Sequence, residues 1–428
     1  MLRKEQNDLI TQTGPGTPMG ELFRRYWIPA LLAQELPAND CPPVRVKLLS
    51  ERLVAFRDSE GRMGLIDEFC PHRGASLWFG RNEQCGLRCP YHGWKFDYTG
   101  QCIEVPSEPP ESKFADKIKL KGYPLVERGG VLWTYMGPAD EQPPLPEWEF
   151  ATVPAKHRFV SKRFQECNYL QAMEGGIDSS HVSFLHSGNL ESDPLFKGAG
   201  GNKYNLADLQ PHFEVVESPG GLYIGARRDA ENGNYYWRIT QWVMPSFTMV
   251  PPRGNHSVHG HFWIPIDDEH CWAWSYDYHP TRELTDAEVA AMKVGKGVHV
   301  KLIPGTYRPV ANKDNDYLMD REAQRRGVTY SGIEGIAIQD GSLQESMGPI
   351  VDRTKENLAS TDNGIIMARH RLMKAAKELQ QKGTLPPGIE PAHQKVRSAS
   401  VILPPDQPFK NAAREALIVR KGIAPASV

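Results

Sequence analysis

Short apolar runs separated by turn residues dominate the chain between residues 44 and 135. The runs are VRVKLL, RLVAF, GLID, GLRC, WKFD and GVLWTYMG, and Gly, Asp-Ser and Pro-rich segments separate them. Runs of this length that are rich in β-branched and aromatic residues are typical of strands joined by tight turns. The pattern predicts a compact antiparallel β domain in this part of the chain.

The pattern changes at a proline-dense stretch, residues 138–154. Its PAD, QPPLP and VP segments disfavour both a helix and a central strand, so we expect a domain boundary there. Aromatic and β-branched runs return between residues 221 and 279, in GLYIGAR, YYWRITQWVM, HGHFWIPI and CWAWSYDY. They predict a second sheet.

Helices are predicted to flank this second sheet. Thr285 and Glu288 resemble a capping box, and residues 361–383 carry apolar side chains at seven-residue intervals before a glycine. Beyond residue 385 the chain is Pro-rich and is interpreted as an arm with one short helix around residues 412–419. The predicted fold class is therefore mixed α and β.

Composition and charge narrow the class of protein. A chain of 428 residues exceeds what one hydrophobic core supports and favours two or three domains. The formal net charge of −2 gives no field that would favour nucleic acid or an anionic membrane. Seven cysteines form no dense disulfide framework, and neither a signal-type segment nor a run of about eighteen apolar residues occurs. We expect a reduced, cytoplasmic protein that contacts neither nucleic acid nor membrane.

Cysteine and histidine occur in two short segments of the β domain with the same ligand pairing. Cys70-Pro-His72 is followed, after sixteen intervening residues, by Cys89-Pro-Tyr-His92. Proline fixes the backbone beside the ligands, and Gly93 permits close approach to a bulky inorganic group. A structural zinc is the alternative, but zinc modules usually pair Cys with Cys and His with His. Two thiolates and two imidazoles suit a 2Fe-2S centre in which two His replace two Cys on one iron.

A second candidate metal motif lies after the predicted boundary, in the segment FQECNYLQAMEGGIDSSHVSFLH. Asp178 and His181 share a face on a helix, so the carboxylate can accept a hydrogen bond from the ring. His186 does not share that face, and Gly175-Gly176 indicates a broken or distorted helix before it. A non-haem Fe(II) oxygenase needs two neutral His and one carboxylate on one side of the metal. The third ligand has to come from elsewhere in the chain.

His259 and His261 offer a rival iron site, with His256 and His270 nearby. In a strand, residues i and i+2 point to one face, and H-x-H is how cupin barrels present two ligands. No matched Glu and later His at cupin spacing follow, and strand histidines commonly face solvent. The rival site therefore stays the alternative.

Both motifs resemble those of a known family. CPHRG…CPYHGWKFD resembles the Rieske cluster motif, and NYLQAMEGGIDSSHVSFLH with QESMGPIVDR resembles the large subunit of Rieske non-haem iron ring-hydroxylating oxygenases of the phthalate dioxygenase type. The resemblance covers most of the chain and implies an α+β fold, with an antiparallel β Rieske domain before a helix-grip (START/Bet v1-like) catalytic domain built on an antiparallel sheet. The implied division is residues 1–40 as an N-terminal segment on the catalytic domain, 41–150 as the Rieske domain and 151–428 as the catalytic domain.

The resemblance also assigns site residues. It implies that the 2Fe-2S cluster is held by Cys70, His72, Cys89 and His92, and the mononuclear Fe(II) by His181, His186 and Asp340. Asp340 lies in the region that carries the family's ligating carboxylate, and Asp352 and Asp362 are weaker candidates. Asp178 matches a family residue that joins the cluster of one subunit to the iron of the next. The resemblance therefore implies that Asp178 has a catalytic role in electron transfer.

The implied activity is that of the oxygenase component of a multicomponent dioxygenase in aromatic hydrocarbon catabolism. Such an enzyme hydroxylates or cis-dihydroxylates an aromatic carboxylate, for example a phthalate or a halogenated benzoate, with O₂. A monooxygenase or O-demethylase acting on an aryl ether acid is the alternative, and an electron-transfer Rieske protein with a degenerate second domain is a further one. The candidate iron triad argues against the electron-transfer protein, because an electron carrier does not need a mononuclear iron site.

The expected protein partners are inferred from a missing dinucleotide-binding motif and from the family resemblance. The glycine cluster at Gly14, Gly16 and Gly20 lies in a proline-interrupted stretch without a preceding strand, so it predicts no dinucleotide site. A separate NAD(P)H-dependent reductase is therefore expected to supply electrons. The family implies a homotrimer or a stack of two trimers, because a heterologous ring places each cluster beside a neighbour's iron.

An aromatic carboxylate requires a cation in an otherwise apolar pocket. The candidates are polar residues of the second sheet and of the iron segment, namely Arg227, Arg228, Arg238, Arg253, Ser179 and Ser180. For each of them a solvated strand edge or turn is the alternative, since the sequence does not show which face of the strands lines the pocket.

Overall fold

The computed structural model describes residues 1–428, apart from the side chain of Pro110. The N-terminal part holds two antiparallel sheets, with strand orders β1-β10-β9-β4-β3-β2 and β5-β6-β7-β8. Their strands are β1 (Trp27–Leu32), β2 (Val44–Leu48), β3 (Glu51–Arg57), β4 (Met63–Asp67), β5 (Arg81–Glu83), β6 (Gly86–Arg88), β7 (Lys95–Phe96), β8 (Cys102–Glu104), β9 (Gly122–Arg128) and β10 (Val131–Tyr135). The predicted antiparallel β domain is confirmed, and each of the six apolar runs overlaps one of these strands.

A larger antiparallel sheet dominates the rest of the chain. Its order is β11-β17-β16-β15-β14-β13-β12, and β18 pairs with β14. The strands are β11 (Arg158–Gln165), β12 (His212–Glu217), β13 (Gly221–Asp229), β14 (Tyr235–Val243), β15 (Phe247–Met249), β16 (Val258–Pro265), β17 (Cys271–Tyr278) and β18 (Ala399–Leu403). The predicted second sheet is confirmed between residues 221 and 279, and β11, β12 and β18 extend it with segments that the pattern did not single out.

Helices cover this sheet and the connections around it. They are α1 (Lys4–Thr11), α2 (Pro18–Arg24), α3 (Glu149–Thr152), α4 (Tyr169–Ile177), α5 (Asn202–Ala207), α6 (Asp286–Lys293), α7 (Arg321–Arg325), α8 (Ile336–Ser346), α9 (Asn363–Lys382), α10 (Pro391–Gln394) and α11 (Phe409–Ala412). Helix α9 packs on β12 and β13, while α4 packs on β14 to β17 and contacts α8. Together these helices bury one face of the sheet, which completes the α+β architecture.

Two predicted helices are confirmed with their termini. The Thr285 side chain accepts from the backbone N–H of Glu288, whose carboxylate accepts in return from the N–H of Thr285, and α6 starts there. Helix α9 ends at Gly383, which adopts φ +66°. A glycine at this left-handed position ends a helix without steric cost.

The proline-dense connector differs from the prediction of no helix, because it contains the one-turn helix α3. Trp148 and Phe150 are each 2% exposed and belong to the core shared by both parts of the chain. The burial of these two aromatic side chains holds the turn in place, although the local sequence disfavours a helix.

The N-terminal 40 residues contribute to both parts of the molecule. Helices α1 and α2 pack on α9, whereas β1 pairs with β10 in the N-terminal sheet. The division at residues 40 and 150 stays a prediction. No helix in the described part of the chain combines the length and apolar character needed to cross a membrane.

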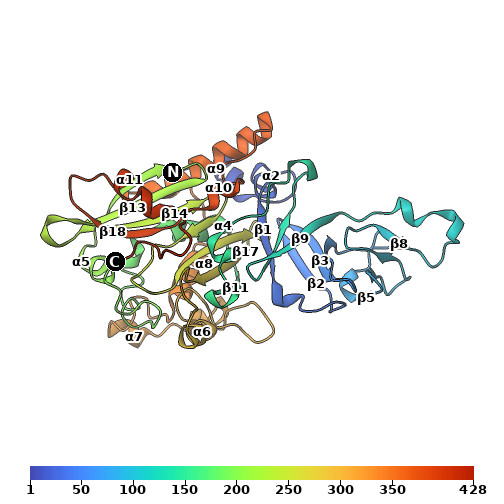
Figure 1. Cartoon of the computed structure of the whole chain (residues 1–428), viewed down its shortest axis with the longest axis horizontal. Helices are drawn as coiled ribbons and strands as arrows, with labels where there is room; N and C mark the ends of the chain where they lie inside the picture. Colours follow the sequence, from blue (N-terminus) through green and yellow to red (C-terminus); the bar gives the residue numbers. More distant parts are fainter.

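Figure 1 shows how the two parts are arranged. The small sheet of β5 to β8 lies at the end of the N-terminal part, far from α4 and α8 in the larger part. The cysteine and histidine segments border the strands of that small sheet, and the second motif follows α4. The two candidate metal centres of one chain therefore lie in different regions of an elongated molecule.

Candidate metal centres

The first centre is formed by two loops with the same backbone conformation. In one loop Cys70 donates its N–H to Ala75 and accepts at its carbonyl from Gly74; in the other, Cys89 donates to Trp94 and accepts from Gly93. Gly74 and Gly93 have φ values of +76° and +78°. Each loop thus needs a glycine four residues after its cysteine, and of the two only Gly93 was predicted from the sequence.

The proposed donors of these loops lie in neighbouring pairs, the two imidazoles beside each other and the two thiols beside each other. The rings of His72 and His92 lie 4.4 Å apart between centroids, and His72 stacks on Trp94 at 4.6 Å with an interplanar angle of 8°. Cys70 and Cys89 are buried, whereas both histidines are exposed. Burial, and then the neighbouring Cys89, raises the pKa of Cys70 to about 11, so cluster binding has to displace a proton. Two buried sulfur donors beside two accessible imidazoles fit a Rieske-type 2Fe-2S group.

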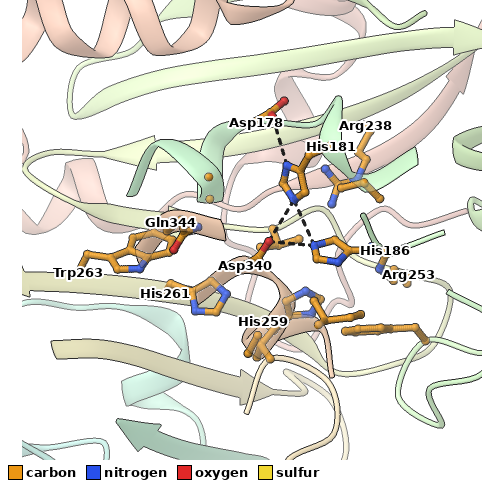
Figure 2. A pocket seen from close by; sticks show the side chains of 18 of the residues that line it. Asp178, His181, His186, Arg238, Arg253, His259, His261, Trp263, Asp340 and Gln344 are labelled. Atoms are coloured by element: carbon orange, nitrogen blue, oxygen red, sulfur yellow. Dashed lines mark hydrogen bonds and ion pairs between the residues drawn. The ribbon is translucent and has the colours of Figure 1, made fainter. Parts of the chain in front are cut away.

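The second centre brings three donors to one point (Figure 2). His186 Nε2 lies 3.1 Å and His181 Nε2 3.5 Å from the same Oδ1 of Asp340. The three ligand atoms all lie within 4.8 Å of one another. Burial opposes ionisation of Asp340, but the two imidazoles outweigh it and lower its pKa to about 2. Two imidazoles and one ionised carboxylate fit the facial triad of a mononuclear Fe(II).

Side chains behind the triad hold each imidazole in the orientation that a metal requires. Asp178 Oδ2 lies 3.2 Å from His181 Nδ1, and Gln339 Oε1 lies 2.8 Å from His186 Nδ1. Both Nε2 atoms therefore remain directed at Asp340. Gln339 is fixed in turn, because its amide donates to Asn189 Oδ1 and to the carbonyl of Ile333. The positioning role of Gln339 was missed, although this residue directly precedes Asp340 in the motif.

The helix break before His186 is confirmed, but its predicted cause is wrong. Helix α4 runs through Gly175 and Gly176 and ends at Ile177, and Asp178 leaves it in an extended conformation. His181 then starts a short 3-10 turn, His181–Ser183. The glycines serve close packing instead, since a Cβ on Gly176 would lie 2.1 Å from the Trp263 ring.

This contact gives a prediction for glycines of α4 and α8. Gly176→Ala is expected to destabilise the protein by about 1–3 kcal/mol, because the added methyl forces Trp263 to move. Gly341→Ala in α8 is the matched control, since no atom lies within 4 Å of its Cβ position and alanine favours a helix by about 0.5–1 kcal/mol. Urea denaturation measures both; equal midpoints for the two variants would contradict the packing role.

The strand register decides which candidate arginines face the pocket. Arg228 lies opposite Tyr236, and Ala226 lies opposite Arg238, so Arg228 and Arg238 share one face of the sheet. Arg227 lies opposite Trp237 on the other face, where its guanidinium stacks 4.1 Å from the Tyr235 ring. Arg238 lines the pocket beside the triad, while Arg227 does not.

The remaining substrate candidates occupy distinct places. Arg253 lines the pocket, and Arg228 lies behind it, where it donates to the carbonyl of Ser179 and to Ser183 Oγ. Ser179 Oγ accepts from Arg238 at 3.0 Å, while Ser180 Oγ is buried without a partner among the described residues. Arg238 therefore forms a polar corner of the pocket, and Ser179 holds it from behind.

The rival histidines lie in the same pocket but form no metal site. His259 and His261 point to one face of β16, as expected, and both line the cavity. In the described part of the chain, however, neither joins two further donors within 4.8 Å. His256 bonds to the carbonyl of Lys197 and His270 to Asp267, away from the pocket.

The weaker carboxylate candidates also lie elsewhere. Asp352 accepts hydrogen bonds from Thr354, and Asp362 accepts from the backbone of Ala359. Neither belongs to the group formed by the two histidines and Asp340.

Comparison with known proteins agrees with this geometry. Residues 26–124 match the Rieske [2Fe-2S] domain, and residues 134–419 match the family described as LigXa C-terminal domain like. The chain is 38% identical to the oxygenase subunit of 3-chlorobenzoate-3,4-dioxygenase from Comamonas testosteroni, over 92% of this chain and 93% of that protein. It is 37% identical to the oxygenase subunit of phthalate 4,5-dioxygenase from Pseudomonas putida, over 89% of this chain and 87% of that protein.

A solved structure shares the fold. The crystal structure of dicamba monooxygenase bound to dicamba superposes with a TM-score of 0.57 at 19% identity, over 83% of this chain and 98% of that chain. At this level of identity the likeness concerns the fold alone.

Proposed function

The chain belongs to the Rieske non-haem iron oxygenases, as an oxygenase subunit with a 2Fe-2S cluster and a mononuclear iron, and on this premise we propose that it hydroxylates an aromatic carboxylate with O₂. The observation that carries the substrate class is a buried cation in the pocket. Arg238 is 5% exposed, lines the cavity beside His181 and bonds to Ser179 Oγ rather than to a carboxylate. Such a guanidinium suits a substrate carboxylate.

We assign the cluster to Cys70, His72, Cys89 and His92, and the iron to His181, His186 and Asp340. We also keep residues 41–150 as the cluster domain and 151–428 as the catalytic domain. When bound, the cluster supplies single electrons and the iron supplies activation of dioxygen. The chain's own residues orient these groups: Asp178 and Gln339 fix the two imidazoles, and apolar side chains such as Val250 and Ile336 line the pocket against water.

The cysteine assignment predicts different results for two buried cysteines of the same domain. Cys89→Ser is expected to abolish the cluster, seen as loss of the red-brown absorption and of acid-labile sulfide. Cys102→Ser is the matched control, because Cys102 is equally buried but its Sγ faces the carbonyl of Glu104 at 3.6 Å. A cluster that persists in Cys89→Ser, or disappears in Cys102→Ser, would contradict the assignment.

An oxygen-uptake screen of substituted benzoates tests the function. The purified oxygenase is combined with a supplied NAD(P)H-dependent reductase, and products are analysed to distinguish a diol from a phenol. Substrate-dependent uptake with a hydroxylated aromatic acid is expected. Absence of uptake and product with every aromatic acid, in protein that carries both metal centres, would contradict the proposal.

We further propose that electrons pass between neighbouring chains of a trimer. The cluster loops lie far from α4 and α8 within one chain (Figure 1), whereas Asp178 is partly exposed beside His181. Large exposed apolar side chains occur near both places: Phe69, Trp78, Phe79 and Tyr91 near the cluster loops, and Phe184, Tyr330, Leu343 and Met347 near the iron motif. Two different surfaces of this kind suit a heterologous ring.

The trimer gives a prediction for the exposed aromatic residues. Phe79 is 63% exposed, and Phe79→Asp is expected to reduce the mass in solution from that of a trimer to that of a single chain. Leu385→Asp, at an exposed leucine of the C-terminal arm, is the control and should leave the mass unchanged. Light scattering measures both, and a wild-type chain that is monomeric at micromolar concentration would refute the ring.

A further inference from the structure

A row of polar side chains runs behind one wall of the pocket, and the two metal centres do not use it. On the wall itself, His261 is 9% exposed and its Nδ1 lies 3.1 Å from Ser275 Oγ. Behind the wall, Ser161 Oγ lies 2.7 Å from His299 Nδ1, and His299 Nε2 lies 3.0 Å from Asp277 Oδ2. Apolar side chains would fill such a space without the cost of desolvating an imidazole and a carboxylate, so the row favours a function.

Strand register joins the two parts of this row. Ser161 on β11 lies directly opposite Ser275 on β17. Directly opposed residues project from the same face of a sheet with Cβ atoms about 4.5–5.5 Å apart, which suits a direct hydrogen bond or one bridging water. Strand β11 is the outermost strand at one end of the sheet, and Ser161 is half-buried while the other four residues are buried. The row therefore extends from the edge of the sheet to the pocket.

The proposed reaction consumes protons inside this pocket. Conversion of an aromatic acid and O₂ to a diol takes two electrons and two protons, and conversion to a phenol and water takes the same. The electrons come from the reductase through the cluster. Arginines line the pocket but stay protonated, so apart from the iron centre its described lining offers two groups that exchange protons, His259 and His261. Of these two, His261 is hydrogen-bonded to the row.

His261 is suited to passing a proton on rather than holding one. Burial, and then the charge of Arg163, lowers the pKa of His261 to about 3, so its ring is neutral at rest. The bond at Nδ1 leaves Nε2 for a group in the cavity, and Figure 2 shows the ring across the cavity from His181. Ser275 Oγ also lies 3.0 Å from the carbonyl oxygen of Val298, so its hydroxyl has two acceptors and can rotate between them.

We propose that Ser161, Ser275 and His261 relay protons from the edge of the sheet to the oxygen that is reduced in the pocket. In each transfer the His261 Nε2–H bond breaks as an O–H bond forms on that oxygen, and Ser275 Oγ gives its proton to Nδ1. Ser161 restores the proton of Ser275 and takes one from water, so one proton enters for each one delivered. His299 and Asp277 are positioning residues that orient the Ser161 hydroxyl. The inference rests on the proposed function, because the reduction of O₂ in this pocket creates the demand for protons.

Removal of one hydroxyl tests the relay. The holoenzyme with chemically reduced clusters is mixed with O₂ and with benzoate, 3-chlorobenzoate or phthalate in separate runs, and product is followed in H₂O and in D₂O. Ser161→Ala is expected to form product about tenfold more slowly and with a larger solvent isotope effect, because a positioned proton donor contributes about 100-fold or more and water replaces it in part. Ser161→Thr keeps the hydroxyl and suits a strand, so it should restore both values.

A second variant and a control assign the effect to the relay. Ser275→Ala interrupts the next link and should give the same two changes. Ser246→Ala is the matched control, because Ser246 is also buried but its Oγ donates to the carbonyl of Trp263, outside the row. It should change neither the rate nor the isotope effect. Mononuclear iron per chain, and the calorimetric affinity of the oxidised holoenzyme for the same acids, should keep their wild-type values in all of these variants.

Two outcomes would overturn the relay while the proposed function stands. Ser161→Ala and Ser246→Ala could form product at the same rate and with the same isotope effect. Alternatively, Ser161→Ala could lose iron or affinity in proportion to its rate, with an unchanged isotope effect, which would mean that the row has a structural role alone. If the wild-type enzyme forms no product from any aromatic acid, the proposed function fails together with the inference.

Discussion

The variant His186→Ala is expected to lose its mononuclear iron and its oxygenase activity while it keeps the 2Fe-2S cluster. His186 Nε2 lies 3.1 Å from Asp340 Oδ1, and the removal of this imidazole leaves one nitrogen and one carboxylate for the metal. Activity should fall by more than the roughly 100-fold that the loss of an outer-shell partner costs, since a direct ligand is lost. Iron and acid-labile sulfide per chain, measured together, separate the two centres.

The matched control is His259→Ala in the same pocket. His259 is also buried, but it belongs to no group of three close donors in the described part of the chain, so this variant should retain mononuclear iron. Full mononuclear iron in His186→Ala, with loss of iron in His259→Ala, would move the site to the histidines of β16.

The second large effect is expected for Asp178→Asn, which should retain both metal centres and transfer electrons slowly. Asp178 Oδ2 lies 3.2 Å from His181 Nδ1, and its side chain is 24% exposed. The amide keeps the size but loses the charge that orients the His181 ring, so turnover should fall about 10- to 100-fold. Stopped-flow reoxidation of the reduced cluster with O₂ and substrate measures the transfer directly.

The control for this variant is Asp362→Asn, at a surface carboxylate beside α9 that contacts neither histidine. It should reoxidise at the wild-type rate. If Asp178→Asn also reoxidises at the wild-type rate with full iron, electrons do not pass through this carboxylate.

The order of the elements could largely be predicted from the sequence, because strands and helices were marked by local pattern. The apolar runs predicted strands in both parts of the chain, among them β2, β3, β10, β14 and β17, and the capping box at Thr285 predicted the start of α6. Strand β1 was missed since WIPALL is uniformly buried and shows no alternation of apolar and polar residues. Helix α3 was missed because its stability comes from the burial of Trp148 and Phe150 in a distant core, which no local pattern reveals.

The features of the candidate site were likewise predictable only in part. The candidate donor residues could be singled out because their types and spacing are restrictive, as at Cys70, His72 and His181, and their assignment stays a proposal. The role of the Gly175-Gly176 pair was not, since it depends on Trp263 and Gln344 from distant segments. The face of each arginine was not predictable either, because it follows from strand register, and register placed Arg227 and Arg228 on opposite faces. Gln339 could have been found as a polar residue directly before Asp340, the carboxylate proposed to bind the iron.

The measurement that tests the central claim most directly is a single turnover without reductase. The holoenzyme with chemically reduced clusters is mixed with an aromatic acid and isotopically labelled dioxygen, and cluster absorption and product are followed together. We predict that the clusters reoxidise as the aromatic acid gains labelled oxygen. Reoxidation without labelled product for every aromatic acid, in protein with full iron at His181, His186 and Asp340, would contradict the assignment of this chain as an aromatic carboxylate oxygenase.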